Sequence, residues 1–247
     1  DLFQKVALDN EEVTTLDGAV NKTAILLGLT ILTASISWNF QGPMMGLISG
    51  IGVAAAMISA IATFGLWIFS WIIKPTPHRA PYTAPIYAAG MGFAIGLISQ
   101  QFESLFPGIV IQAVSLTFFV AASLLLLYKT GVIRPDQNFL LIMACATLGI
   151  FFTYIANIFY AMATGSSFSI ITDTGLMGIG FSLFVVVIAA LNLVLDFDII
   201  EQAAETRAPK YMEWFGAMAL VMTLIWLYLE ILRLLAKLFP QQLVVIL

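Results

Sequence analysis

Two aspartates stand near the end of a long apolar stretch, where a buried charge is costly and usually serves function. Asn192 and Asp196 lie four residues apart, so they share one helix face. Asp198 is turned about 200° from Asp196, because each helical residue rotates by about 100°. We therefore expect Asp196 to face inward with Asn192, and Asp198 to face elsewhere, such as the water interface. A solvated cytoplasmic helix end that holds both aspartates is the alternative.

A third carboxylate, Glu230, lies deeper, about 27 Å of helix beyond Met212 at 1.5 Å per residue. At that depth it must face a cavity, carry a proton or meet a cation. One interpretation is a local pair with Arg233, three residues on. The other is a carboxylate that lines a water-filled ion path. If Asp196 and Glu230 approached each other, they would share a proton and form a pH switch and a weak cation site. Tyr154, in another apolar run, is expected to make an interhelical hydrogen bond.

The remaining residues argue against an enzyme. A single histidine, His78, cannot build a His-based metal cluster, and a single cysteine, Cys145, cannot form an intramolecular disulfide. The chain has no nucleophile elbow, phosphate loop or zinc motif. Asp196 and Asp198 share one helix, whereas an intramembrane aspartyl protease needs catalytic aspartates on two helices. We predict no enzymatic activity and no covalent cofactor.

Composition indicates what kind of fold positions these groups. The 247 residues are 61% hydrophobic and 10% charged, against about 45–50% and about 25% in soluble domains. The mean hydropathy of +1.00 excludes a soluble globular enzyme and a disordered chain. At about 20 apolar residues per crossing, the chain can supply roughly seven spans in contact with membrane lipids. Its net charge of −4, with ten basic residues, argues against nucleic acid as a partner.

The sequence predicts an all-α polytopic membrane protein. The runs are longer than barrel strands and apolar on all faces, as membrane helices are. Ala88, Gly92 and Gly96, spaced four apart, are expected to form a helix-packing face. The predicted spans are 23–40, 44–73, 83–102, 108–128, 138–163, 174–200 and 212–239. The predicted parts are an acidic N-terminal tail (1–22), a seven-helix transmembrane domain (23–239) and a short C-terminal tail (240–247).

Lysine and arginine occur in the N-terminal tail and in the loops after the second, fourth and sixth spans, and they are missing from the loops after the first, third and fifth. The basic residues thus fall on one side of the membrane, and the side that carries them is the cytoplasmic one. We therefore expect a cytoplasmic N-terminus. Arg233 and Lys237 break the trend, so the last span either stops short of the far surface or keeps these cations for an internal role. The eight residues on the predicted cytoplasmic side are Lys5, Lys22, Lys74, Arg79, Lys129, Arg134, Arg207 and Lys210.

Several segments carry a resemblance to a known family. They are 87–113, 126–131, 178–201, which ends in LDFDIIE, and 208–233, which ends in WLYLEILR. In these segments the chain resembles the Bax inhibitor-1 (TMBIM, YccA-like) family, and most of all its longer bacterial branch. The similarity covers roughly residues 20–239, and the last two segments are the most specific. The resemblance implies a bacterial inner-membrane protein with six helices around a central C-terminal helix.

The resemblance also implies a pH-sensitive Ca²⁺ leak controlled by aspartates on the last two helices. These positions fall on Asp196 and on Glu230, where the family's Asp is replaced by Glu. Both become candidate proton and weak Ca²⁺ ligands, with Asn192, Asp198 and Arg233 in supporting roles. A family arginine at the end of the second helix has Lys74 or Arg79 as its nearest counterpart, a possible gate cation. Either extra turns of the last helix reach into the cytoplasm, or Glu230 lies well above Asp196 and the two do not meet.

A second hypothesis is a bundle that conducts nothing and binds another membrane protein. YccA-like relatives are linked to a membrane-bound AAA protease, so a regulator of membrane proteolysis or a subunit of a larger complex fits the same sequence. The acidic tail and the small-residue faces suit this role equally well. A stoichiometric partner that copurifies with the chain would favour it.

Overall fold

A computed structural model describes residues 13–39 and 77–246, with side chains described through residue 239. Within these residues the fold is all-helical, and six helices are long and apolar enough to cross a membrane. The chain is therefore an integral membrane protein, and six of the seven predicted spans are confirmed as long apolar helices. The predicted span 44–73 and the gate candidate Lys74 lie outside the described residues.

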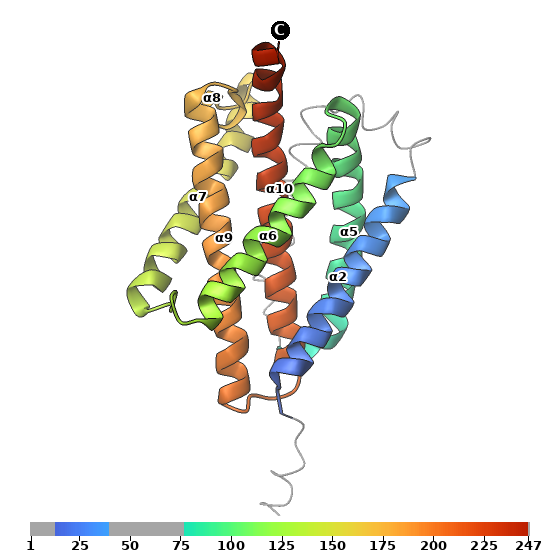
Figure 1. Cartoon of the computed structure of the whole chain (residues 1–247), viewed down its shortest axis with the longest axis vertical. Coiled ribbons are helices and arrows are strands. Elements are labelled where there is room, and N and C mark those ends of the chain that lie inside the picture. The colour runs from blue at the N-terminus through green and yellow to red at the C-terminus, as the bar shows by residue number, and fades with distance from the viewer. Residues whose placement is uncertain (1–12, 40–76, 247) are drawn as a thin grey trace, which may run out of the picture.

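Six long helices and two short elements follow one another along the chain (Figure 1). The elements are α2 (Leu16–Trp38), η2 (Pro77–Arg79), α5 (Ala80–Leu105), α6 (Ile109–Lys129), α7 (Gln137–Thr164), α8 (Ser169–Thr172), α9 (Leu176–Glu205) and α10 (Met212–Ile246).

Local capping chemistry sets several helix ends. Asp136 caps α7 through its side chain, which accepts from the Phe139 amide at 2.7 Å, and Gly165 ends α7 with φ at 72°. Gly108 begins α6 with φ at 85°, a conformation that glycine adopts without strain. The Glu103 carboxylate at the end of α5 accepts from the Gly108 amide at 2.6 Å, which ties α5 to α6.

The last two helices form an antiparallel hairpin, and α10 packs against α2, α5, α6 and α9. In Figure 1, α10 lies between α9 and α5. Of the six candidate spans, α10 is the most deeply buried and α9 the next. Fully buried side chains such as Leu193, Val221 and Leu227 fill the space around this hairpin. Large apolar side chains on the outside of α6 and α7, such as Phe119 and Phe152, are exposed, as lipid contact requires.

The small-residue face on α5 is a contact surface with α2. A Cβ atom added at Gly92 would lie 2.8 Å from the Thr30 Cα, and one at Gly96 would lie 2.8 Å from the Ala34 Cα. Both separations are shorter than real Cβ atoms show. The two helices therefore approach closely because these positions have no side chain.

We expect Gly92→Ala and Gly96→Ala each to destabilise the protein by about 1–3 kcal/mol, because the new methyl group must push α2 away. Thermal unfolding in detergent measures this effect. Gly90→Ala on the same helix is the matched control, since no atom lies within 4 Å of its added Cβ. The better helix propensity of alanine should leave that variant unchanged or slightly more stable. Equal melting temperatures for all three variants would contradict the close approach.

Candidate functional site

Glu230 lies inside the bundle on α10 with 2% of its surface exposed. The Arg233 Nη1 lies 2.9 Å from both of its carboxylate oxygens. The Tyr154 hydroxyl, on α7, lies 3.1 and 3.2 Å from the same oxygens. The local pair that the sequence left open is therefore present, and it is joined by a hydroxyl from a second helix.

Arg233 binds Tyr154 as well as Glu230. Its Nη1 donates to the Tyr154 hydroxyl oxygen at 2.5 Å, and its guanidinium carbon lies 5.2 Å from the centre of the tyrosine ring. A cation over an aromatic face is attracted by the ring quadrupole. Tyr154, Glu230 and Arg233 thus form one hydrogen-bonded network that links α7 to α10. Tyr154 makes the interhelical hydrogen bond expected of it.

Lys237 continues the same face of α10 one turn further on. It is 5% exposed, and its Nζ donates to the Gly178 carbonyl at 2.9 Å. Gly178 lies in the first turn of α9. Arg233 and Lys237 thus bind groups inside the protein, which is the internal role that the sequence offered as one explanation for their position.

Asp196, on α9, is 8% exposed and has a different environment. The Thr223 hydroxyl on α10 lies beside it and donates to the Ala219 carbonyl of its own helix at 3.2 Å. Among the described residues, its Oδ2 has no hydrogen-bond partner, and no lysine or arginine of that part of the chain forms an ion pair with it. Asp196 is thus a buried carboxyl group with a polar neighbour and, within the part of the chain that the structure describes, no ion-pair partner.

The two supporting residues on α9 hydrogen-bond to groups other than Asp196. The Asn192 amide donates to Thr147 Oγ1 on α7 at 3.1 Å and to its own helix at the Ile188 carbonyl. Asp198 accepts from Gln202 at 2.5 Å and from the Tyr128 hydroxyl on α6 at 3.3 Å. Within the described residues, neither Asn192 nor Asp198 forms a hydrogen bond with Asp196.

Asp196 and Glu230 lie at different levels of the hairpin. Thr223, the neighbour of Asp196, precedes Glu230 by seven residues, which is about 10 Å along the α10 axis. Within the described ranges no hydrogen bond joins the two carboxylates. The sequence left two arrangements open, and these contacts favour the one in which Glu230 lies well beyond Asp196 and the two carboxylates do not meet.

The gate candidate Arg79 is exposed at the start of α5 and makes no ion pair within the described part of the chain. Its neighbour His78 contacts the Tyr211 ring, with ring centres 6.1 Å apart, next to the loop between α9 and α10. Arg79 is therefore near the loop end of the hairpin and contacts neither carboxylate. Among the described residues no group of three or more His, Cys, Asp or Glu side chains could hold a metal ion.

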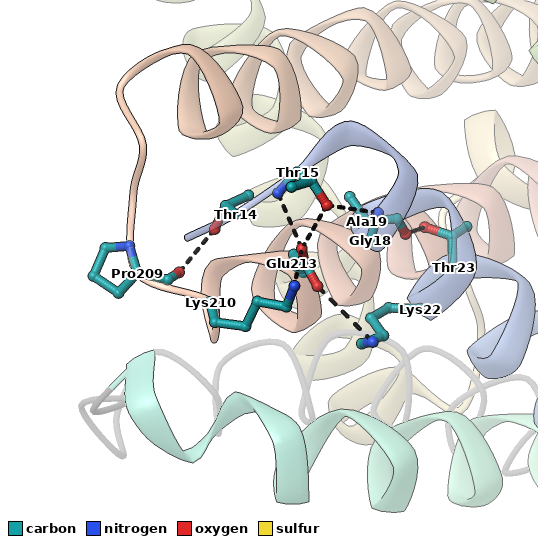
Figure 2. Close-up of polar contacts among 9 residues, drawn as sticks. All are labelled: Thr14, Thr15, Gly18, Ala19, Lys22, Thr23, Pro209, Lys210 and Glu213. Carbon is teal, nitrogen blue, oxygen red and sulfur yellow. Dashed lines mark hydrogen bonds and ion pairs between the residues drawn. The ribbon is translucent and has the colours of Figure 1, made fainter. Parts of the chain in front are cut away.

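Sequence analysis missed a third buried carboxylate, Glu213, in the first turn of α10 (Figure 2). It is fully buried and is bound by Thr15 and by two lysines, Lys22 and Lys210. Its position at a predicted helix start gave no reason to expect burial. Lys210 lies three residues away, but Thr15 and Lys22 come from the start of α2, and no local spacing could have revealed those two contacts.

A family model described as Bax inhibitor 1 like matches residues 2–239, nearly the whole chain. No curated protein matches it.

We expect Arg233→Gln to destabilise the protein by about 3–5 kcal/mol, because it leaves a buried carboxylate without its cation. The double variant Glu230→Gln/Arg233→Gln should recover much of this loss, since no unpaired charge remains. Thermal unfolding of the two single variants and the double variant gives the coupling between them. Arg134→Gln, at an exposed loop position, is the charge-matched control. Additive effects of the two substitutions would show that the pair carries no coupling.

Proposed function

Because the chain belongs to the Bax inhibitor 1 like family, we propose that it is a pH-sensitive leak for cations such as Ca²⁺. In this proposal Asp196 is the proton sensor and the Glu230–Arg233 pair is a latch. The observation that carries the proposal is the environment of Asp196, a carboxyl group buried in a membrane bundle that forms no ion pair with any lysine or arginine of residues 13–39 and 77–239.

An unpaired carboxylate in such a place is expensive and is retained where it binds a proton or an ion. Protonation removes the charge of Asp196, and a passing cation can balance it instead. A proton and a cation therefore compete for the same group. This competition makes cation flux depend on pH without any further sensor.

The contacts of Glu230 support the role of a latch. Arg233 is attached to the same helix and lies where a free cation would have to bind Glu230. Tyr154 extends the contact to α7, so breaking the ion pair would also loosen α7 from α10. While the pair is intact, Glu230 is closed to other cations.

The transported ion would bind only weakly. Ca²⁺ takes six to eight oxygen ligands, and Asp196 with Thr223 supplies a small part of that number. The rest would have to be water, so binding is transient, as a leak requires. Lys74 and Arg79 remain candidate gate cations at the cytoplasmic end of the path.

The proposal includes the complete architecture. Residues 44–73 supply the seventh crossing, and the helices surround α10, whose contacts with four other helices fit a central position. The N-terminus lies in the cytoplasm, and the membrane is a bacterial inner membrane. A bundle that conducts nothing and serves a membrane-protein partner is the competing function.

Ca²⁺ flux into liposomes that hold the purified protein, scanned from about pH 5 to about pH 8, tests the proposal. We expect a leak whose rate changes across this range in the wild type and does not change in Asp196→Asn. Glu230→Gln should raise the flux at every pH, because Arg233 is then released, and it should keep the pH dependence, because Asp196 still exchanges its proton.

Glu205→Gln is the matched control, since Glu205 is an exposed carboxylate at the end of the same helix as Asp196. It should keep the wild-type profile. Absence of flux at every pH would reject the leak and favour the competing function. An unchanged profile in Asp196→Asn would reject Asp196 as the sensor.

A further inference from the structure

The contacts of Glu213 join the start of α2 to the start of α10 (Figure 2). The Thr15 amide and hydroxyl both donate to Glu213 Oε1 at 3.0 Å. The Lys210 Nζ lies 3.2 Å from the same oxygen, and the Lys22 Nζ lies 3.9 Å from Oε2. Thr15 and Lys22 lie at the start of α2, whereas Lys210 lies in the loop before α10 and Glu213 in the first turn of α10.

The backbone next to Thr15 runs along the loop between α9 and α10. The Thr14 amide donates to the Ala208 carbonyl at 2.8 Å, and the Thr14 hydroxyl donates to the Pro209 carbonyl at 2.8 Å. Val13 and Pro209 form an antiparallel bridge. We call residues 13–15 the strap, because they bind this loop in an extended conformation.

The loop under the strap begins at the end of α9, where the Arg207 and Ala208 amides donate to the Ala204 and Ala203 carbonyls at 3.2 and 2.9 Å. Arg207 has φ at 51°, a left-handed conformation that non-glycine residues rarely adopt unless surrounding contacts hold them there. The two hydrogen bonds of Thr14 fix the residues that follow Arg207 directly. The Pro209 carbonyl also accepts from the Met212 amide at 2.9 Å, so the strap binds the loop where α10 begins.

The start of α2 is shaped to receive Glu213. Thr15 is the N-cap of α2 and accepts from the Gly18 amide at 3.0 Å. The positive end of the helix dipole favours an anion at this place. Gly18 leaves the space that the Glu213 carboxylate fills, because a Cβ added there would overlap it.

We propose that the strap is an intramolecular clamp that holds the α9–α10 hairpin closed at its loop end. Both proposed functional carboxylates lie on this hairpin, Asp196 on α9 and Glu230 on α10. When the strap leaves Glu213 and the loop, the hairpin becomes free to move. The clamp stands on its own contacts, and only its effect on flux rests on the proposed function.

Trypsin digestion of the detergent-solubilised protein tests the clamp without reference to transport. The loop contains two trypsin sites, Arg207 and Lys210. In Gly18→Ala the added methyl group displaces Glu213, and we expect cleavage at these sites to be about tenfold faster, since proteolysis follows the population of the open form. Cleavage at Lys129, the exposed last residue of α6, should not change and is the internal control.

Gly28→Ala on the same helix is the matched control variant, since no atom lies within 4 Å of its added Cβ. Thr14→Val, which removes the hydroxyl donor to Pro209 and keeps the shape, serves as the second variant if Gly18→Ala fails to fold. Loop cleavage at the same rate in both test variants as in Gly28→Ala would overturn the clamp.

A reversible lock separates the clamp from the proposed function. Val13→Cys with Pro209→Cys, in a Cys145→Ser background, places two thiols at bridge partners, whose Cα atoms lie about 4.5–5.5 Å apart and can form a disulfide. Oxidation should protect the loop from trypsin and lower Ca²⁺ flux, and reduction should reverse both effects.

If oxidation protects the loop from trypsin but leaves a measurable Ca²⁺ flux unchanged, the strap does not control transport. If the wild type shows no flux, the proposed function fails, and the trypsin rates alone decide the clamp.

Discussion

A charge inside a membrane bundle is costly, so a buried carboxylate must obtain compensation from groups of the protein, from a proton or from an ion. Glu230 obtains it from Arg233 on its own helix and from the Tyr154 hydroxyl on α7. Glu213 obtains it from the start of α2 and from two lysines. Asp196 has a hydroxyl neighbour and no cation in the described chain. The three carboxylates therefore have three different capacities to accept a proton or an ion.

The three carboxylates lie at three successive positions along the α9–α10 hairpin. At the loop end, Glu213 fixes α10 to α2 and carries the strap. About two turns of α10 beyond Thr223, Glu230 and Arg233 fix α10 to α7. Asp196 lies between these two polar connections. A change at either connection would alter the packing around Asp196. The latch and the clamp would therefore both act on this one buried carboxyl group.

The sequence predicted the helices better than it predicted their contacts. Long apolar runs set the spans, because each must satisfy its own backbone in lipid, and the spacing of Gly92 and Gly96 predicted a packing face. Helical rotation also predicted that Asp198 turns away from Asp196. The contacts of Glu213 could not be predicted, because Thr15 and Glu213 are 198 residues apart in the chain. Spacing on one helix likewise could not decide whether Asp196 meets Glu230, since this depends on the register between two helices.

The central claim is that Asp196, and not Glu230, exchanges a proton in the closed protein. Infrared difference spectroscopy between about pH 5 and about pH 8 measures this directly, through the carbonyl stretching band of a protonated carboxyl group. The account predicts a pH-dependent band that disappears in Asp196→Asn and persists in Glu230→Gln. A band that persists in Asp196→Asn and disappears in Glu230→Gln would contradict it.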